Sequence, residues 1–383
     1  MQPSFDLPAL TEDRRRCESL VEVFVGTDGL GPSRLATLVR RSPLPSTQTL
    51  DLLARGESSP VPMSNRRTTA WDELAVRFRA ALVGGLPMAR ARWWLSGDPG
   101  WDARFGDDED SPAALCVVGQ LSALAGPRVA IVGTRSASAA GLAFARELGF
   151  ALGRAGVSIV SGLARGIDGA AHRGATSDMS ISGRPIGVLG TGTSIVYPRE
   201  HHALQAVVAE RGVLLSEYEP GRGPRPEAFP RRNRIVAQLA QAVVVVESGA
   251  KGGSLLTVNE ATFRSRPVLA VPNNPLVRSA AGSNALLRES GGAPPLALPC
   301  HGVADILAVL DYQAVLHGER IDDRHSPEGT TEAILGAIGW DRRTTSAVST
   351  ESGLSLTETA VALAWLEEHR WIEHRSGRWS RIP

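Results

Sequence analysis

The sequence predicts an α/β fold with a doubly wound, mostly parallel sheet, an N-terminal helical domain and a C-terminal winged helix. From residue 127 onward, short apolar runs alternate with amphipathic helical segments, and this alternation is typical of βαβ units in a parallel sheet. The segment before it reads mainly as helices, and the last segment as three helices followed by a hairpin. The expected domains are residues 1–100, 101–312 and 330–383, with a polar linker at 313–329.

The predicted sheet is built from short apolar runs that are separated by helical patterns. Its strands are expected at 128–133, 157–161, 185–190, 213–216, 242–247 and 268–271, and its helices at 141–154, 168–176, 200–210, 233–241 and 254–265. Right-handed crossovers place the loops that follow the strands along one edge of the sheet. Ligands of open α/β sheets bind at this edge.

The terminal domains each contain a pattern that is shared with DNA-binding modules. In the N-terminal domain, a glycine-rich turn at 26–32 joins two helical patterns and resembles a helix-hairpin-helix or a SAM-like domain. The match is degenerate, and a helical packing module is the favoured interpretation. In the C-terminal domain, helices at 331–338, 344–349 and 355–369 precede a hairpin that turns at Ser376 and Gly377. This order matches a winged helix, which binds DNA or docks proteins.

Composition excludes several classes of protein. No apolar run reaches the length of a membrane span, and the N-terminus lacks a signal-peptide core. The cysteines, Cys17, Cys116 and Cys300, are far apart and lack metal-ligand spacing. We therefore expect a cytoplasmic protein with no disulfide, no metal and no cofactor. The net charge of +1 is uninformative, but arginines cluster at 222–234 and Lys251 is the only lysine.

Three of the expected strand-end loops combine glycine, a hydroxyl side chain and a cation. They contain Gly133, Thr134 and Arg135; Ser161, Gly162, Arg165 and Gly166; and Lys251 with Ser254. Loop N–H groups and helix N-termini bind anions, and arginine adds a bidentate phosphate donor. A single such turn often serves only helix–sheet packing, but three on one edge favour a groove that follows a phosphate backbone. Ser254 is expected to cap its helix.

Other residues near these loops have plainer interpretations. Ser161 and His172 lack the companions of a nucleophilic pair, so His172 is expected to cap or pack a helix and Asp168 to be an N-cap. Arginines at 231–234 open a helix, where cations are unfavourable. A phosphate or an internal carboxylate such as Glu247 would compensate them.

At these residues the chain resembles the DprA/Smf family of DNA-processing proteins. The resemblance runs in the family's order over about residues 95–295. Its motifs are 132–135, 161–168 with His172, 197–198, 216–218, 229–234, 251–257 and 282–284. The chain departs from the family at Gly252, at His201 and His202, and at 272–273.

The resemblance implies a Rossmann-like domain that binds single-stranded DNA and forms a homodimer. It also implies that the protein protects incoming strands during natural transformation (competence) and helps to load RecA recombinase, without catalysis. Matching the motifs and the loops, the expected DNA-binding residues are Gly133, Thr134, Arg135, Ser161, Gly162, Arg165, Gly166, Arg231, Asn233, Arg234, Lys251 and Ser254. The alternatives are a nucleotide-processing enzyme of a related fold and a winged-helix transcription regulator.

Overall fold

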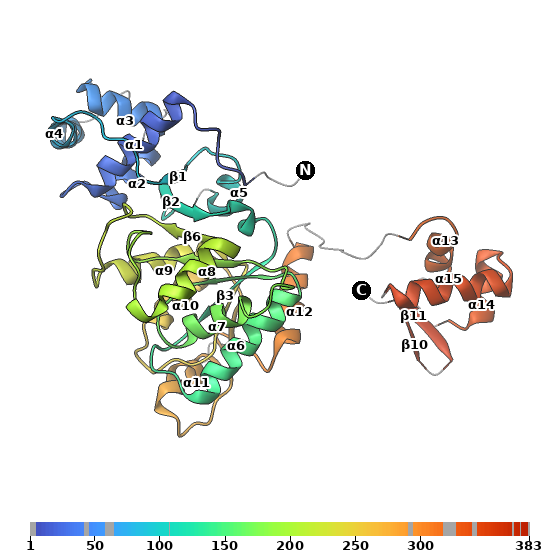
Figure 1. Cartoon of the computed structure of the whole chain (residues 1–383). Helices are drawn as coiled ribbons and strands as arrows, with labels where there is room; N and C mark the ends of the chain where they lie inside the picture. Colours follow the sequence, from blue (N-terminus) through green and yellow to red (C-terminus); the bar gives the residue numbers. More distant parts are fainter. Residues whose placement is uncertain are drawn as a thin grey trace. The chain divides into compact units, whose positions relative to one another are not determined.

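The computed structural model describes residues 5–41, 46–57, 65–106, 108–289, 294–316, 327–338, 343–369, 371–375 and 377–381. The chain divides into two compact units, Met1–Gln313 and Ala314–Pro383. Figure 1 shows the sheet and its flanking helices in the first unit, and a small helical unit with a hairpin in the second.

A mostly parallel sheet forms the centre of the first unit, as predicted. Among the described residues its strands run in the order β1-β2-β6-β5-β4-β3-β7-β8-β9. The strands from β6 to β9 in this order are all parallel. The six predicted strands are confirmed, with ends that differ by at most two residues: β3 (Arg128–Val132), β4 (Ser158–Ser161), β5 (Pro185–Val188), β6 (Val213–Ser216), β7 (Ala242–Val245) and β8 (Val268–Ala270). β9 (Leu298–Pro299) adds a short edge strand.

Helices cover both faces of this sheet and form a doubly wound, Rossmann-like arrangement (Figure 1). One face packs on α6 (Ala139–Arg154), α7 (Ile167–Ala175), α8 (His202–Arg211) and α12 (Val303–Leu316). The other face packs on α9 (Ala228–Leu239) and α10 (Ser254–Phe263). The strand order reverses between β3 and β7, so the topological switch point lies at their carboxyl ends.

Two antiparallel strands extend the sheet where only helices were expected. β1 (Arg92–Leu95) pairs with β2 (Ala114–Gly119), and β2 pairs with β6. Alternate side chains of a strand point to opposite faces. Trp93 therefore enters the core of the N-terminal helices, whereas Trp94 enters the core of the sheet. The domain boundary near residue 100 stays a prediction, and β1 belongs to both cores.

The N-terminal helices pack on one another and on β1 and β2. They are α1 (Glu12–Gly26), α2 (Pro32–Arg41), α3 (Ser46–Arg55) and α4 (Asn65–Ala81). Their core contains Phe24, Phe78 and Trp71. The short helices α5 (Asp102–Phe105) and α11 (Ala281–Leu286) complete the first unit.

The second unit has the predicted order of three helices and a hairpin. These elements are α13 (Thr330–Ile338), α14 (Thr345–Ser352), α15 (Leu356–Glu368), β10 (Ile372–Arg375) and β11 (Arg378–Arg381). The predicted turn at Gly377 lies between the strands, and Ser376 lies outside the described residues. Assignment as a winged helix stays a prediction. Part of the expected linker is helical, since α12 runs to Leu316, and residues 317–326 lie outside the described residues.

The cysteines are buried and carry no disulfide. Burial raises the pKa of the Cys17 and Cys116 thiols to about 12. A thiol is a nucleophile or metal ligand only as its thiolate, so burial keeps these side chains inert. Within the described ranges, no helix is both long enough and apolar enough to cross a bilayer.

Candidate nucleic-acid interface

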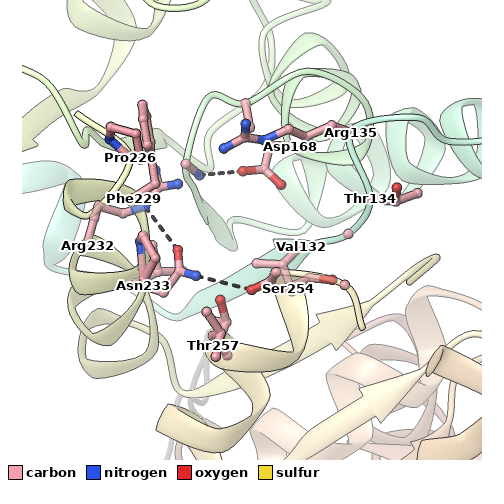
Figure 2. Close-up of a pocket in the computed structure, with 18 of the residues that line it drawn as sticks. Val132, Thr134, Arg135, Asp168, Pro226, Phe229, Arg232, Asn233, Ser254 and Thr257 are labelled. Atoms are coloured by element: carbon pink, nitrogen blue, oxygen red, sulfur yellow. Dashed lines mark hydrogen bonds between the residues drawn. The ribbon is translucent and has the colours of Figure 1, made fainter. Parts of the chain in front are cut away.

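A groove of about 530 Å³ opens at the switch point of the sheet. Its floor is formed by the loops after β3 and β4, and its walls by the first turns of α9 and α10. Figure 2 shows Asn233 on α9 facing Ser254 on α10, with Arg135 and Asp168 on the side of the groove away from α10. The predicted gathering of the loops along one edge of the sheet thus produces a real concavity.

Close backbone packing fixes the loops that form the floor. The N–H of Thr134 donates to the carbonyl of Glu247 at 2.7 Å and ties the loop after β3 to the end of β7. Gly166 has a φ of 74°, and a Cβ there would lie 2.1 Å from the carbonyl oxygen of Thr134. Only glycine combines this backbone conformation with such an approach. Gly166 therefore joins the two floor loops and does not line the groove.

Arg232 is a buried cation in the groove wall, which the sequence-based prediction omitted. It is 6% exposed, its guanidinium donates to the carbonyl of Val188, and its Nε lies 3.2 Å from Oδ1 of Asn233. Burial lowers its pKa, and the nearby carboxylate of Asp168 opposes this effect. Gly162 packs directly on the guanidinium, since a Cβ at Gly162 would lie 2.1 Å from Nη1. A charged side chain thus supports the floor from below.

Asp168 holds the loop after β4, but not as the expected N-cap. The N-cap of α7 is Gly166, and Asp168 is the second residue of the helix. Its Oδ2 accepts a hydrogen bond from the N–H of Gly162 at 3.1 Å. Burial raises the pKa of the Asp168 carboxyl, and the charge of Arg232 opposes this shift. The Gly162 N–H is therefore already used within the protein.

The start of α10 forms the opposite wall. Its N-cap is Gly253, so the expected capping role of Ser254 is wrong; the Ser254 hydroxyl donates instead to Oγ of Ser248 at 2.8 Å. Nδ2 of Asn233 donates to the carbonyl of Gly253 at 3.4 Å and links the two walls. The first turn of α10 holds no acidic residue. The positive end of its helix dipole is left available for an anion.

Aromatic rings and an arginine form the edge of the groove. The rings of Phe229 and Tyr197 lie 5.2 Å apart between centroids, and the guanidinium of Arg135 lies 5.3 Å from the Phe229 centroid. Tyr197 is 38% exposed. Exposed aromatic faces beside a cation can stack with a nucleobase.

The groove brings half of the predicted site residues together. Its lining includes Gly133, Thr134, Arg135, Gly162, Asn233 and Ser254. Arg165 lies beside it, in an adjoining cavity of about 30 Å³ that also contains Arg135 and Tyr197. Lys251 is exposed on the loop before α10 and is not among the lining residues.

The remaining predicted residues have other contacts. Ser161 is buried and donates to the carbonyl of Ile131 at 2.7 Å. Arg234 forms an ion pair with Glu217 at 2.7 Å. Arg231 lines a separate cavity on the other side of α9.

Glu247 does not compensate the arginines of α9. Its carboxylate accepts from the hydroxyl and N–H of Ser138 at 2.7 Å and 3.1 Å. Ser138 is the N-cap of α6, so Glu247 stabilises the positive end of that helix. Among the described arginines of α9, the carboxylate partners are Glu217 for Arg234 and the nearby Asp168 for Arg232.

His172 is a buried residue of α7. Of its two expected roles, capping or packing a helix, it has the packing role. It is 0% exposed, and within the described residues neither ring nitrogen has a hydrogen bond of ordinary geometry. Burial lowers the pKa of His172 to about 4, with smaller contributions from His201 and Arg232, although the nearby Ser161 backbone favours the protonated ring.

This buried histidine predicts a loss of stability in acid. Because the folded-state pKa lies below the unfolded one, the unfolded chain takes up a proton first as the pH falls. The contribution of His172 to the free energy of unfolding should therefore fall by about 3 kcal/mol between about pH 7 and about pH 4, since one pKa unit equals about 1.4 kcal/mol. Urea titrations measure this, with His172→Phe as the control that removes the titrating group. An unchanged pH dependence in His172→Phe would contradict the assignment.

The family model of DNA recombination-mediator protein A matches residues 92–301, which contain the whole groove. The chain belongs to this family. Among its relatives, a putative DNA processing protein DprA of Mycobacterium tuberculosis is 36% identical over 275 residues, 70% of this chain and 68% of that protein. Protein Smf of Synechocystis is 36% identical over 248 residues, 62% of this chain and 61% of the relative. The chain thus matches less than two thirds of the Synechocystis family member.

The crystal structure of DNA processing protein A (DprA) from Streptococcus pneumoniae has a similar fold. It superposes with a TM-score of 0.60 and 28% identity, and the match covers 76% of this chain and 95% of the other. The resemblance to the DprA/Smf family and the Rossmann-like fold are therefore confirmed.

Proposed function

We propose that this chain binds single-stranded DNA in the switch-point groove and acts as a recombination mediator. The observation that carries the proposal is the edge where Phe229 contacts both Tyr197 and Arg135, in the same groove as the start of α10. Stacking needs an exposed base face, which a single strand offers and a duplex hides. The positive end of α10 and the guanidinium of Arg135 supply donors for the adjacent phosphates.

The groove suits binding better than catalysis. Asp168 is the one carboxylate among its described lining residues, and it is buried and bonded to the loop. The Ser254 hydroxyl is bonded to Ser248. A hydrolytic site needs a nucleophile or water with a base in reach. We therefore infer a non-enzymatic role, for which the absence of base release from nucleoside monophosphates is the direct check.

We further propose RecA recombinase as the partner, a homodimer as the working form and natural transformation in the cytoplasm as the setting. The partner, the homodimer and the setting are what the resemblance to the DprA/Smf family implies, the cytoplasm is expected from composition, and the family's description as a recombination mediator supports the recombinase partner. The test is RecA nucleation on a strand that is coated with single-strand-binding protein. The ATPase activity of RecA reports the lag before nucleation. The chain should shorten the lag, and Arg135→Ala should shorten it less. An equal lag with and without the chain would refute the mediator role.

Arg165 is held by a surface ion pair at the end of the groove. Its Nε donates to Glu200, and both side chains are largely exposed. If the strand passes Arg165, Glu200 competes with phosphate for it. We expect Glu200→Gln to increase the affinity for oligo-dT by about two- to fivefold, the scale of an exposed pair, and Arg165→Ala to decrease it. Fluorescence anisotropy measures both, and unchanged affinity in both variants would place Arg165 outside the strand's path.

A further inference from the structure

A second cavity, of about 400 Å³, lies on the other side of the first turn of α9. One of its walls is the turn between α1 and α2, residues 27–34, and the other is formed by residues 222–231. Pro226, Phe229 and Pro230 line the groove. Arg225, Glu227, Ala228 and Arg231 line the second cavity instead. A single helical turn thus separates the two concavities.

The second cavity carries an excess of positive charge. Arg34, Arg222, Arg225 and Arg231 line it, against the carboxylates of Asp28 and Glu227. Arg222 lies 3.6 Å from Glu219, yet its buried Nε has no hydrogen-bond partner in the described part of the chain. The other three arginines are exposed and make no ion pair with a described residue. None of these three guanidinium groups is therefore neutralised by an ion pair with a described carboxylate.

The turn between α1 and α2 gives the second cavity backbone N–H donors beside these cations. Gly29 and Gly31 have φ values of 79° and 81°, and the Gly31 carbonyl accepts from the N–H of Leu35 at the start of α2. The N–H groups in the first turn of a helix lack intrahelical acceptors. Because α2 begins at Pro32, these donors are the N–H groups of Ser33 and Arg34, and the turn contains no acidic residue. Nη1 of Arg231 lies 3.4 Å from Oγ of Ser33 and joins the two walls.

We propose that the second cavity binds phosphates of the same DNA strand after it leaves the groove. The inference rests on the proposed function of the groove. An α-helix is only about 10 Å across, so a strand can pass over the first turn of α9 and meet both concavities. Arginine suits phosphate because its planar fork binds two oxygens. Cations distributed over two separate walls fit a backbone with repeated charges better than a single small anion.

Strand length separates the second cavity from the groove. A short oligo-dT of about six nucleotides fills the groove alone, and one of about twenty reaches both concavities. We expect the paired variant Arg34→Gln, Arg225→Gln to bind the short strand like the unmodified chain and the long strand about tenfold more weakly. For the long strand, the slope of log affinity against log salt concentration should become shallower by about 1.4. Each lost phosphate contact to a single strand reduces this slope by about 0.7. Fluorescence anisotropy at several salt concentrations measures both effects.

Glu227→Gln is the matched variant, because it removes a negative charge from the same cavity where the paired variant removes positive charges. It should strengthen binding of the long strand only. Unchanged long-strand affinity in the paired variant would overturn the second site, as would an equal loss at both lengths. The paired variant could instead lose binding of polyglutamate while it keeps full binding of DNA. That result would assign the cavity to an acidic protein segment. Failure of the unmodified chain to bind either strand would refute the proposed function itself.

Discussion

Gly162→Ala should destabilise the chain through a clash in the floor of the groove. The added Cβ would fall 2.1–2.3 Å from three atoms of the Arg232 guanidinium. Arg232 is buried and bonded to the Val188 carbonyl, so it cannot move aside without losing that bond. We expect a loss of about 2–4 kcal/mol in the free energy of unfolding, from overpacking plus a strained charged hydrogen bond. Urea titration measures the loss.

Gly253→Ala is the matched control, because it adds the same methyl group to the same groove where nothing lies within 4 Å. It should leave stability close to that of the unmodified chain. A double-mutant cycle with Arg232→Met sharpens the test, since Gly162→Ala should cost less once the guanidinium is gone. Equal costs in both backgrounds would mean that Arg232 does not support the floor.

Arg135→Ala should weaken binding of single-stranded DNA more than any other single change in the groove. Arg135 lines both the groove and the adjoining cavity, and it lies over Phe229. Its loss removes a phosphate donor and one partner of the stacking edge. We expect oligo-dT to bind about 10–100-fold more weakly, the range of an interface hot spot. The slope of log affinity against log salt concentration should also become shallower by about 0.7, the value for one phosphate contact to a single strand.

Arg146→Ala provides the control for total charge. Arg146 is exposed on α6 and is not among the residues that line the groove. Its removal changes the net charge by the same amount as Arg135→Ala. Equal weakening in both variants, seen by fluorescence anisotropy, would indicate a general electrostatic effect and contradict a specific strand-binding role for Arg135.

The parallel sheet could be predicted from sequence because its strands are buried on both faces. Such strands are continuous apolar runs, as at 242–247, and are easily separated from amphipathic helices. β1 was missed because it has only four residues, and β2 because it pairs antiparallel with β6, far away in sequence. The two tryptophans of β1 point to opposite faces of the sheet. No local sequence pattern indicates that β2 pairs with β6.

The candidate site was predicted in outline, since glycine, hydroxyl and cationic residues follow three of the strands. Which arginine of α9 lines it could not be predicted. Arg231, Arg232 and Arg234 are neighbours in sequence, yet one lines the second cavity, one is buried under Gly162 and one pairs with Glu217. Helical rotation separates them, and their partners come from β5 and from the loop after β6. Long-range contacts therefore decide each role.

The most direct test of the account is a titration of labelled oligo-dT by fluorescence anisotropy, beside a duplex of the same length. Because the groove offers stacking and phosphate donors together, the account predicts tighter binding of the single strand. It also predicts an affinity that falls steeply with salt as counterions are released. Equal or tighter binding of the duplex, or no binding of the single strand at low salt, would contradict it.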